Sequence, residues 1–485
     1  MTQKTTPGLG SRMLSGGLVI ALTQGCIVLI GFLAQRAILS TLEKDANGLL
    51  NVERRIAELI LVILVDVGLN GIAMRRLVQF PERANEILSS LLAFRLTMLI
   101  PATLVCLIWS GLSGYNTTDV ALYCLFLGIS SRSGLVRYAL ELPFRANVRF
   151  TLISATSIVD AVVFAGLVYL WKDELSPSIV IKAQFLSAIP GFIILLFLGE
   201  THRLRLRFVS VLEIRTLLIE TMPVLVTVIL VNIHDKVDSL MLERLTDEEQ
   251  VGIFSAAYGS LGPIPSTIAM SLALAMAPGI ARLAIDDFAS CRRYAFTGLR
   301  FLLVIAVCIS AFLSVLTPFI IELLSKGRYS DNHAHFFAFL WMPAPIFLLV
   351  FIQELNVALG KQSRNIPVAW TLFLGTVILG FALIPAYGAF GAIVAKLGTL
   401  AVASSFAIVS FTQILSQPLP LSLVLRLLLL VAIGVTASLL IPNVLPMTLA
   451  AFAALIAVLI ATLVLGVVDK SDVMKVKSLL FASRG

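Results

Sequence analysis

The stretch "MPVLVTVILVNIHDKVDSLML", residues 222–242, decides the fold class, because an apolar run passes without a break into a charged end. Its first twelve residues carry no charge, and His234, Asp235, Lys236 and Asp238 fall within the next five. Ionisable groups are costly in hydrocarbon, so we expect them on an apolar, membrane-spanning helix only where water or a partner stabilises them. Either this helix reaches water at that point, or one of its faces borders a wet passage.

The composition of the whole chain indicates a membrane protein. The 485 residues are 59% hydrophobic and only 13% charged, with a mean hydropathy of +0.99. A soluble chain of this length carries far more charge on its surface. Apolar runs of membrane-spanning length recur from end to end, whereas the alternating ten-residue segments of a β-barrel are not evident. We therefore expect an all-α polytopic membrane protein with little chain left for a soluble domain.

Hydropathy predicts about fourteen membrane-spanning helices. Their expected ranges are 15–35, 54–74, 88–110, 119–142, 150–171, 179–198, 216–240, 250–276, 296–324, 335–358, 365–385, 389–413, 421–441 and 446–467. An even number of spans places both termini on the same side of the membrane.

The distribution of basic residues orients these spans. Far more Lys and Arg residues fall in the set of loops that includes both termini than in the opposite set, so the positive-inside rule puts both termini in the cytoplasm. Lys4 and Arg12 precede an apolar stretch without a small-residue cleavage site, which favours a retained first span over a signal peptide. The basic segment 199–215 is expected to lie on anionic headgroups of the cytoplasmic (inner) membrane.

Two similar strings suggest an internal repeat. "LSTLEKDANGLLNV" begins at Leu39 and "LERLTDEEQVGIFSA" begins at Leu242, and both place a glycine, Gly48 or Gly252, after a charged turn. We predict two pseudo-symmetric six-helix lobes around a central cavity, followed by two C-terminal helices. The corresponding domains are 1–198 (N-lobe), 199–215 (linker), 216–415 (C-lobe) and 416–485 (last two helices and a basic tail).

Six basic residues fall inside the predicted spans: Arg95, Arg132, Arg137, Lys182, Lys236 and Lys396. Each costs about 2.5–3.5 kcal/mol at mid-bilayer on insertion scales, so it is expected to face a wet interior or an acidic partner. Guanidinium and ammonium groups are suited to binding phosphate. The alternative is that each cation pairs with a nearby carboxylate, such as Asp66, Glu141, Asp160 or Glu354.

The charges of the quoted stretch also have two interpretations. Asp235 and Asp238 are three residues apart and His234 and Asp238 are four apart, so on a helix they share a face, while Lys236 is expected to point elsewhere. They are either groups at a helix end in water, or a proton or Na⁺ site at a cavity mouth. The candidate substrate-binding residues are Arg36, Arg54, Arg132, Arg137, Lys236 and Lys396, and the candidate ion-coupling residues are Asp235, Asp238 and Glu354.

Motifs for chemistry are missing from the sequence. There is no Walker A sequence, no G-x-S-x-G and no H-E-x-x-H, so an enzyme is not expected. The five cysteines show no paired spacing, and neither disulfides, a metal nor a cofactor is expected beyond a coupling H⁺ or Na⁺.

Several strings of the sequence carry a family resemblance. "DVGLNGIAMRRL" (66–77) and residues 222–258, with Asp238 and Gly252 at recurrent positions, resemble the end of the second span and the seventh span of the polysaccharide flippases of the multidrug/oligosaccharidyl-lipid/polysaccharide exporter superfamily. Further similar strings are "LLSKGRYSDNHAHFFAFLW" (323–341), "NVALGKQSRN" (356–365) and "LIPAYGAFGAIVAK" (383–396). Together they cover most of residues 10–415.

This resemblance implies alternating-access transport of an undecaprenyl-pyrophosphate-linked oligosaccharide (an O-antigen, capsule or exopolysaccharide repeat unit) to the outer leaflet, driven by an ion gradient. The lipid-linked substrate and membrane lipids are then the partners, with a polysaccharide polymerase and chain-length machinery as candidates and no nucleic acid. A lipid II flippase is an alternative, because some of those relatives have fourteen spans. So is a cation-coupled multidrug exporter, although embedded cations count against it. A membrane-embedded glycosyltransferase or polymerase would need large outside loops or a catalytic carboxylate motif, and neither is seen.

Overall fold

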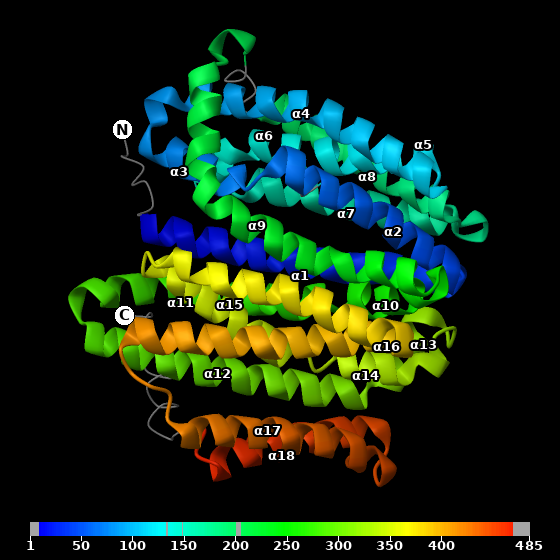
Figure 1. The fold of residues 1–485 in the computed structure, drawn as a ribbon, viewed down its shortest axis with the longest axis vertical. Coiled ribbons are helices and arrows are strands. Elements are labelled where there is room, and N and C mark those ends of the chain that lie inside the picture. The colour runs from blue at the N-terminus through cyan, green and yellow to red at the C-terminus, as the bar shows by residue number, and fades with distance from the viewer. Residues whose placement is uncertain (1–8, 132–133, 148, 200–204, 469–485) are drawn as a thin grey trace, which may run out of the picture. The chain divides into compact units, whose positions relative to one another are not determined.

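The computed structural model describes residues 9–131, 134–147, 149–199 and 205–468, and these are helical or in short connections, with no strand among them. The chain forms two compact units, Met1–Gly252 and Ile253–Gly485. The boundary between them falls inside α10 (Glu248–Leu261), just after its first turn. Figure 1 shows the helices of both units.

The first unit contains nine α-helices before α10. They are α1 (Leu9–Thr41), α2 (Lys44–Leu61), α3 (Leu69–Gln79), α4 (Ala84–Ser113), α5 (Thr117–Leu125), α6 (Leu135–Ala146), α7 (Thr151–Leu170), α8 (Pro177–Leu198) and α9 (Val211–Leu245). Within it, α7 packs against α1 and α8, and α2 packs against α4, α5, α8 and α9.

Two of the predicted spans in this unit are broken helices. The span beginning with α2 widens into a π-helical turn at Val62–Asp66 and is interrupted at Val67 and Gly68, whose φ angles are 49° and 80°. The span of α5 and α6 has a similar π-helical turn at Phe126–Ser130. π-helical turns are rare and occur frequently at functional sites. Neither break contains a proline, so hydropathy predicted continuous helices at both places.

Helix α9 is bent. Its segments Val211–Met222 and Leu225–Leu245, called here the first and second arms of α9, meet at 67°. Figure 1 shows α9 changing direction between them. The bend includes Pro223, which has no N–H to donate to the preceding turn of the helix. The quoted sequence stretch therefore starts at the bend and runs along the second arm.

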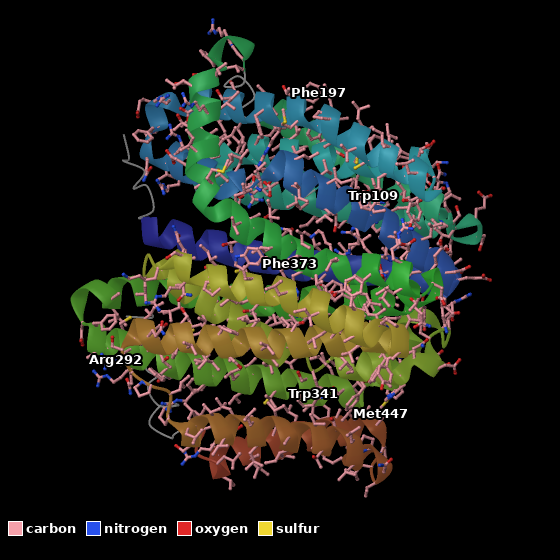
Figure 2. The ribbon with its side chains drawn as sticks, in the orientation of Figure 1. Trp109, Phe197, Arg292, Trp341, Phe373 and Met447 are labelled. Carbon is pink, nitrogen blue, oxygen red and sulfur yellow. The ribbon has the colours of Figure 1, made fainter. Side chains whose placement is uncertain are left out.

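The second unit contains the remaining helices. They are α11 (Pro263–Asp286), α12 (Phe288–Val315), α13 (Thr317–Ser325), α14 (His333–Phe339), α15 (Pro343–Ala358), α16 (Asn365–Leu415), α17 (Leu421–Leu440) and α18 (Met447–Val464). Helix α12 packs against α11, α15, α17 and α18. Trp341, labelled in Figure 2, lies in the apolar core that α12 shares with α17 and α18.

Ten helices of the described chain are long and apolar enough to cross a membrane, or eleven when the two arms of α9 count as one span. Within the described residues, each of the fourteen predicted spans falls mainly on helix, although some of them are interrupted by a turn. One difference is α16, which at 51 residues would be about 75 Å long if straight, more than twice the hydrocarbon thickness. Gly388, with φ of 53°, breaks α16 where two spans were predicted to meet. Two further predicted spans are not among the ten or eleven, and they fall on α1 and on α10–α11.

The outer side chains of these helices suit lipid. Phe197 is 83% exposed and Trp109 is 43% exposed, and both are labelled in Figure 2. Exposed Leu, Ile, Val and Phe residues continue along α4, α8, α16, α17 and α18. A soluble protein rarely exposes apolar surface on this scale, so the chain is a multi-pass membrane protein.

Candidate functional site

Five charged side chains meet where α2 packs against the second arm of α9. Arg54 Nε lies 2.7 Å from Glu58 Oε1, and Arg55 Nη1 lies 2.9 Å from Glu58 Oε2. From α9, Lys236 Nζ lies 3.3 Å from Asp235 Oδ2 and 3.9 Å from Glu58 Oε2, and Arg55 reaches Asp235 at 3.7 Å. We call Arg54, Arg55, Glu58, Asp235 and Lys236 the α2–α9 cluster.

The α2–α9 cluster contains three cations and two carboxylates, so its ion pairs leave one positive charge in excess. The side chains of Arg54 and Asp235 are 44% and 38% exposed, whereas that of Lys236 is only 10% exposed. The cluster is therefore partly accessible, although it belongs to helices long enough to span the membrane. A partly accessible cluster with excess positive charge can accept an anion.

Sequence reasoning singled out Arg54, Lys236 and Asp235 of this cluster but missed Glu58. The signal was present, because Glu58 follows Arg54 by four residues and Arg55 by three, the spacings of helical ion pairs. The expectation that Lys236 points away from the acidic pair is wrong. A lysine side chain is long enough to reach its sequence neighbour Asp235 and, one turn back, Asn232 Oδ1 at 3.2 Å.

The other acidic candidate of the quoted stretch is inside the unit. Asp238 is 2% exposed and His234 is 6% exposed, both on the second arm of α9. The simple interpretation that the helix has reached water at this point therefore does not hold for these two residues.

Arg95 connects the two helix breaks. Its side chain is completely buried on α4, and it donates hydrogen bonds to Asn70 Oδ1 at 2.6 Å and to the carbonyl oxygen of Leu135 at 2.5 Å. It also forms an ion pair with Asp66 at 3.3 Å. Asp66 and Asn70 flank the first break, and Leu135 begins the helix after the second. The guanidinium group of Arg95 thus stabilises both helix breaks. Its partner Asp66 is one of the carboxylates that the sequence predicted as possible partners of the embedded cations.

Arg137 is also buried and paired. It lies 3.2 Å from Glu141 Oε1, forms a very short ion pair with Asp160, and donates to the carbonyl oxygen of Ser130 at 3.1 Å. Arg145 completes the charge balance by pairing with Glu141 at 2.7 Å. Arg137, like Arg95, is therefore paired with carboxylates, and its side chain is not open to a substrate.

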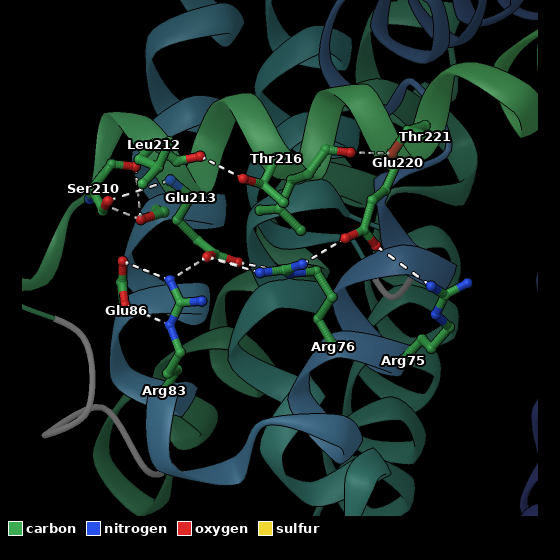
Figure 3. Close-up of polar contacts among 12 residues, drawn as sticks. Arg75, Arg76, Arg83, Glu86, Ser210, Leu212, Glu213, Thr216, Glu220 and Thr221 are labelled. Carbon is green, nitrogen blue, oxygen red and sulfur yellow. Dashed lines mark hydrogen bonds and ion pairs between the residues drawn. The ribbon is translucent and has the colours of Figure 1, made fainter.

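A third set of ion pairs joins the first arm of α9 to α3 and α4 (Figure 3). Arg76 lies between two glutamates, with Nε at 2.8 Å from Glu213 Oε1 and Nη1 at 2.5 Å from Glu220 Oε1. Arg83 pairs with Glu213 and Glu86, and Arg75 with Glu220. This anchoring network, Arg75, Arg76, Arg83, Glu86, Glu213 and Glu220, contains three cations and three carboxylates and is therefore balanced.

The two glycines of the predicted repeat lie against one another's helices. A Cβ atom at Gly48 would overlap the carbonyl oxygen of Glu248, and one at Gly252 would overlap the carbonyl oxygen of Lys44. Lys44 and Glu248 are the first residues of α2 and α10, so the two contacts are reciprocal. Asn47 Nδ2 also donates to the carbonyl oxygen of Gly252 at 3.0 Å. The absent side chains allow the first turns of the two helices to touch.

Two groups at this end of the unit, outside the long apolar spans, have raised pKa values. Burial, together with Asp45, Glu243 and Asp247, raises the pKa of Glu248. Burial and a hydrogen bond with Glu243 raise the pKa of Tyr115. Acidic groups therefore gather around the starts of α2 and α10.

The remaining candidates lie elsewhere. Arg36 is half-buried on α1, and Arg132 lies outside the described residues. In the second unit, Lys396 is 3% exposed on α16 with its ammonium group 4.7 Å from the centre of the Tyr258 ring. Glu354 is half-buried on α15. The structure therefore brings together Arg54, Lys236 and Asp235 among the predicted residues, and holds Arg137 in a separate network.

Comparison with known proteins places this arrangement in a family. The family model described as "Polysaccharide biosynthesis protein" matches residues 13–284, more than half of the chain. The chain belongs to this polysaccharide biosynthesis protein family. A second family model, MatE, matches residues 223–386. A search of curated protein sequences gives no match.

Solved structures share the fold of this family member at low sequence identity. The lipid II flippase MurJ, in an inward closed conformation, matches with a TM-score of 0.68 at 11% identity, over 92% of this chain and 98% of that one. An inward-facing multidrug resistance MATE transporter matches with a TM-score of 0.64 at 11% identity, over 80% and 94% of the two chains. A transporter of the same superfamily from Pyrococcus furiosus matches with a TM-score of 0.59 at 11% identity, over 84% and 96%. The all-helical fold is thus that of the exporter superfamily.

Proposed function

We propose that this protein is a flippase that moves an undecaprenyl-pyrophosphate-linked oligosaccharide from the cytoplasmic to the outer leaflet of the bacterial inner membrane. The observation that carries the proposal is the α2–α9 cluster, in which Arg54, Arg55 and Lys236 outnumber their carboxylate partners by one. A pyrophosphate is an anion that guanidinium and ammonium groups bind well. Membership of the polysaccharide biosynthesis protein family supports a polysaccharide precursor as the molecule that carries it.

The proposed mechanism is alternating access driven by an ion gradient. Asp235, Asp238 and Glu354 remain the proposed coupling residues, with H⁺ or Na⁺ as the ion. Asp235 is well placed to link ion binding to substrate binding, because it pairs with Lys236 and Arg55 within the α2–α9 cluster. A change in the charge of Asp235 would change the positive excess that holds the substrate. Both termini are proposed to lie in the cytoplasm, and the polymerase and chain-length machinery are proposed partners.

Gene deletion, with two measurements, tests the proposal. We expect surface polysaccharide to be lost and its lipid-linked precursor to accumulate on the cytoplasmic leaflet. Re-expression of the wild-type protein should restore export, whereas Lys236→Gln should not, because it removes the excess charge of the α2–α9 cluster. Arg75→Gln is the matched control, since Arg75 is 58% exposed and belongs to the anchoring network. Normal polysaccharide in the deletion strain would contradict the proposal.

The alternative function is multidrug export, for which the MatE match and the shared fold are the observations in favour. A site for cationic drugs should carry excess negative charge, which the α2–α9 cluster does not. Sensitivity of the deletion strain to cationic drugs, with intact polysaccharide, would favour this alternative. Accumulation of lipid II instead of an oligosaccharide precursor would favour a lipid II flippase.

A further inference from the structure

Two buried carboxyl groups lie on neighbouring helices beside the α2–α9 cluster but take no part in its ion pairs. Glu53 on α2 is 1% exposed, and Asp119 in the first turn of α5 is 3% exposed. Helices α2 and α5 pack together, and the acidic groups that interact with Glu53 are Asp119 and Glu248. Two neighbouring carboxyl groups that repel one another when charged favour a state in which one of them keeps a proton.

Asp119 is built to be the charged member of the pair. Its Oδ2 atom accepts a hydrogen bond from Asn116 Nδ2 at 3.0 Å and a very short one from Ser178 Oγ of α8. It also lies in the first turn of α5, where the N–H groups of the helix favour a negative charge. Each of these contacts stabilises the carboxylate form of Asp119.

Glu53 has the opposite surroundings. Both of its carboxylate oxygens are buried without a hydrogen bond of standard geometry, and the polar group close to them is the backbone N–H of Asn116. The next residue, Arg54, does not serve it, because the Arg54 guanidinium pairs with Glu58 one turn further along. A carboxylate in this position would be desolvated and repelled by Asp119, whereas a protonated carboxyl group avoids both costs.

Tyr123 supplies a third group to the same place. It lies one turn beyond Asp119 on α5, its side chain is completely buried, and its hydroxyl group has no hydrogen-bond partner. Glu53 and Asp119 are among the groups that interact with it. A phenol hydroxyl can donate to a carboxylate, so Tyr123 offers Glu53 a hydrogen bond when Glu53 loses its proton.

We propose that Glu53, Asp119 and Tyr123 form a proton-binding site in which Glu53 carries the proton and Asp119 stays ionised. The other charged groups around it are Glu248 of α10 and, on α2 itself, Arg54 and Glu58, while Lys236 of α9 faces Glu58. That this proton drives transport rests on the proposed function. Loss of the proton would add a negative charge next to Arg54 of the α2–α9 cluster, which would weaken the attraction of the cluster for a bound anion.

Infrared spectroscopy of the purified full-length protein in lipid tests the proton site without any substrate. The wild-type protein should show the C=O band of a protonated carboxyl group at neutral pH. Glu53→Gln should lose this band, whereas Glu43→Gln should keep it, because Glu43 is an exposed glutamate at the start of α2. A wild-type spectrum without the band, or a band that survives in Glu53→Gln, would overturn the proposal.

A second variant keeps the test decisive if Glu53→Gln does not fold. Asp119→Asn removes the neighbouring negative charge, so the Glu53 band should disappear at a lower pH than in the wild type. An unchanged titration of the band in Asp119→Asn would contradict the pairing of the two carboxyl groups.

The transport role is measured separately. Glu53→Gln mimics the protonated state permanently, so polysaccharide export should fall and depend less steeply on an imposed pH gradient. Export that keeps its full pH-gradient dependence in Glu53→Gln would overturn the transport role of the proton. If the infrared band behaves as expected but gene deletion leaves polysaccharide unchanged, the proton site stands and the proposed flippase function fails.

Discussion

The two arms of α9 carry charged clusters that differ in balance and in exposure. On the first arm, Arg76 and Glu213 are 6% and 1% exposed, and the hydrogen bonds of Arg76 to Glu213 and Glu220 are 2.5 to 3.0 Å long. In the α2–α9 cluster, Arg54 and Arg55 hold Glu58 at 2.7 and 2.9 Å, but Lys236 and Asp235 of the second arm take part in looser contacts of 3.3 to 3.9 Å, and one cation is in excess. Tight, balanced pairs leave no capacity for a ligand, whereas loose, unbalanced pairs can exchange a carboxylate for an anion. The first arm is therefore structural and the second is the candidate for binding.

The largest expected effect comes from breaking the balanced cluster. Arg76→Ala removes the guanidinium that the buried Glu213 shares with the partly exposed Glu220, and removal of one partner from a buried ion pair costs about 3–5 kcal/mol. Arg75→Ala is the matched control, since its side chain is 58% exposed and 3.7 Å from Glu220, and it should cost less than about 1 kcal/mol. Thermal unfolding of the purified proteins, together with their levels in the membrane, measures the difference. Equal stability of the two variants would show that the anchoring network is not structural.

The second prediction tests how α2 is positioned beside the second arm. Gly48→Ala places a methyl group on the carbonyl oxygen of Glu248, so the starts of α2 and α10 must move apart. Overpacking of this kind costs about 1–3 kcal/mol, and the shift should also reduce export by moving Arg54 and Arg55. Gly166→Ala is the control, because a Cβ atom there meets nothing within 4 Å. Replacing that helical glycine should be neutral, or stabilising by up to about 1 kcal/mol. A Gly48→Ala protein as stable and active as Gly166→Ala would contradict the close contact.

The positions of the helices were predictable from the sequence, but their breaks and partners were only partly so. Long apolar runs fix where helices cross a membrane, and the predicted spans 365–385 and 389–413 leave a gap that contains the interruption at Gly388. The π-helical turns before Val67 and Ser131 are mostly apolar and contain no proline, and Arg95 from a different helix stabilises both breaks. No local pattern records such a tertiary contact.

Some of the ion pairs were predictable from the sequence and others were not. Asp66, Glu141 and Asp160 were predicted as possible partners of embedded cations, and Arg95 and Arg137 do pair with them. The pairing of Arg76 with Glu213 spans 137 residues of sequence and could not be predicted without knowing that α3 packs on α9. The direction of Lys236 was predicted wrongly because helical spacing describes where a side chain starts and not how far a flexible lysine reaches.

The third prediction separates stability from function on the second arm. Arg54→Gln removes a partly exposed partner of Glu58, so the free energy of unfolding should change by less than about 1 kcal/mol. Export should nevertheless fall strongly, because the α2–α9 cluster loses its excess positive charge. Arg54→Lys keeps the charge without the forked geometry and should recover part of the export. Stability by thermal unfolding and export by surface polysaccharide are measured on the same variants. A large loss of stability with Arg54→Gln would mean that both arms of α9 are structural.

The smallest expected effect comes from Glu248 at the start of α10, just after the second arm ends. Burial and the acidic neighbours Asp45, Glu243 and Asp247 raise the pKa of Glu248, so the folded protein binds this proton more tightly than the unfolded chain. The resulting stability is fully present below the ordinary glutamate pKa of about 4.3 and is lost as the pH rises through the raised value. Glu248→Gln should therefore stabilise the protein at neutral pH by roughly a few tenths of a kcal/mol, since Glu248 is only partly buried and water screens its repulsion from the acidic neighbours, and should have no effect in acid. Glu249→Gln should act in the opposite direction at neutral pH, because Glu249 lies 3.5 Å from Lys44 and loses that attraction. Melting temperatures of both variants, measured in acid and at neutral pH, check the signs. If the two variants shift in the same direction at neutral pH, the electrostatics of this helix start differ from the contacts described.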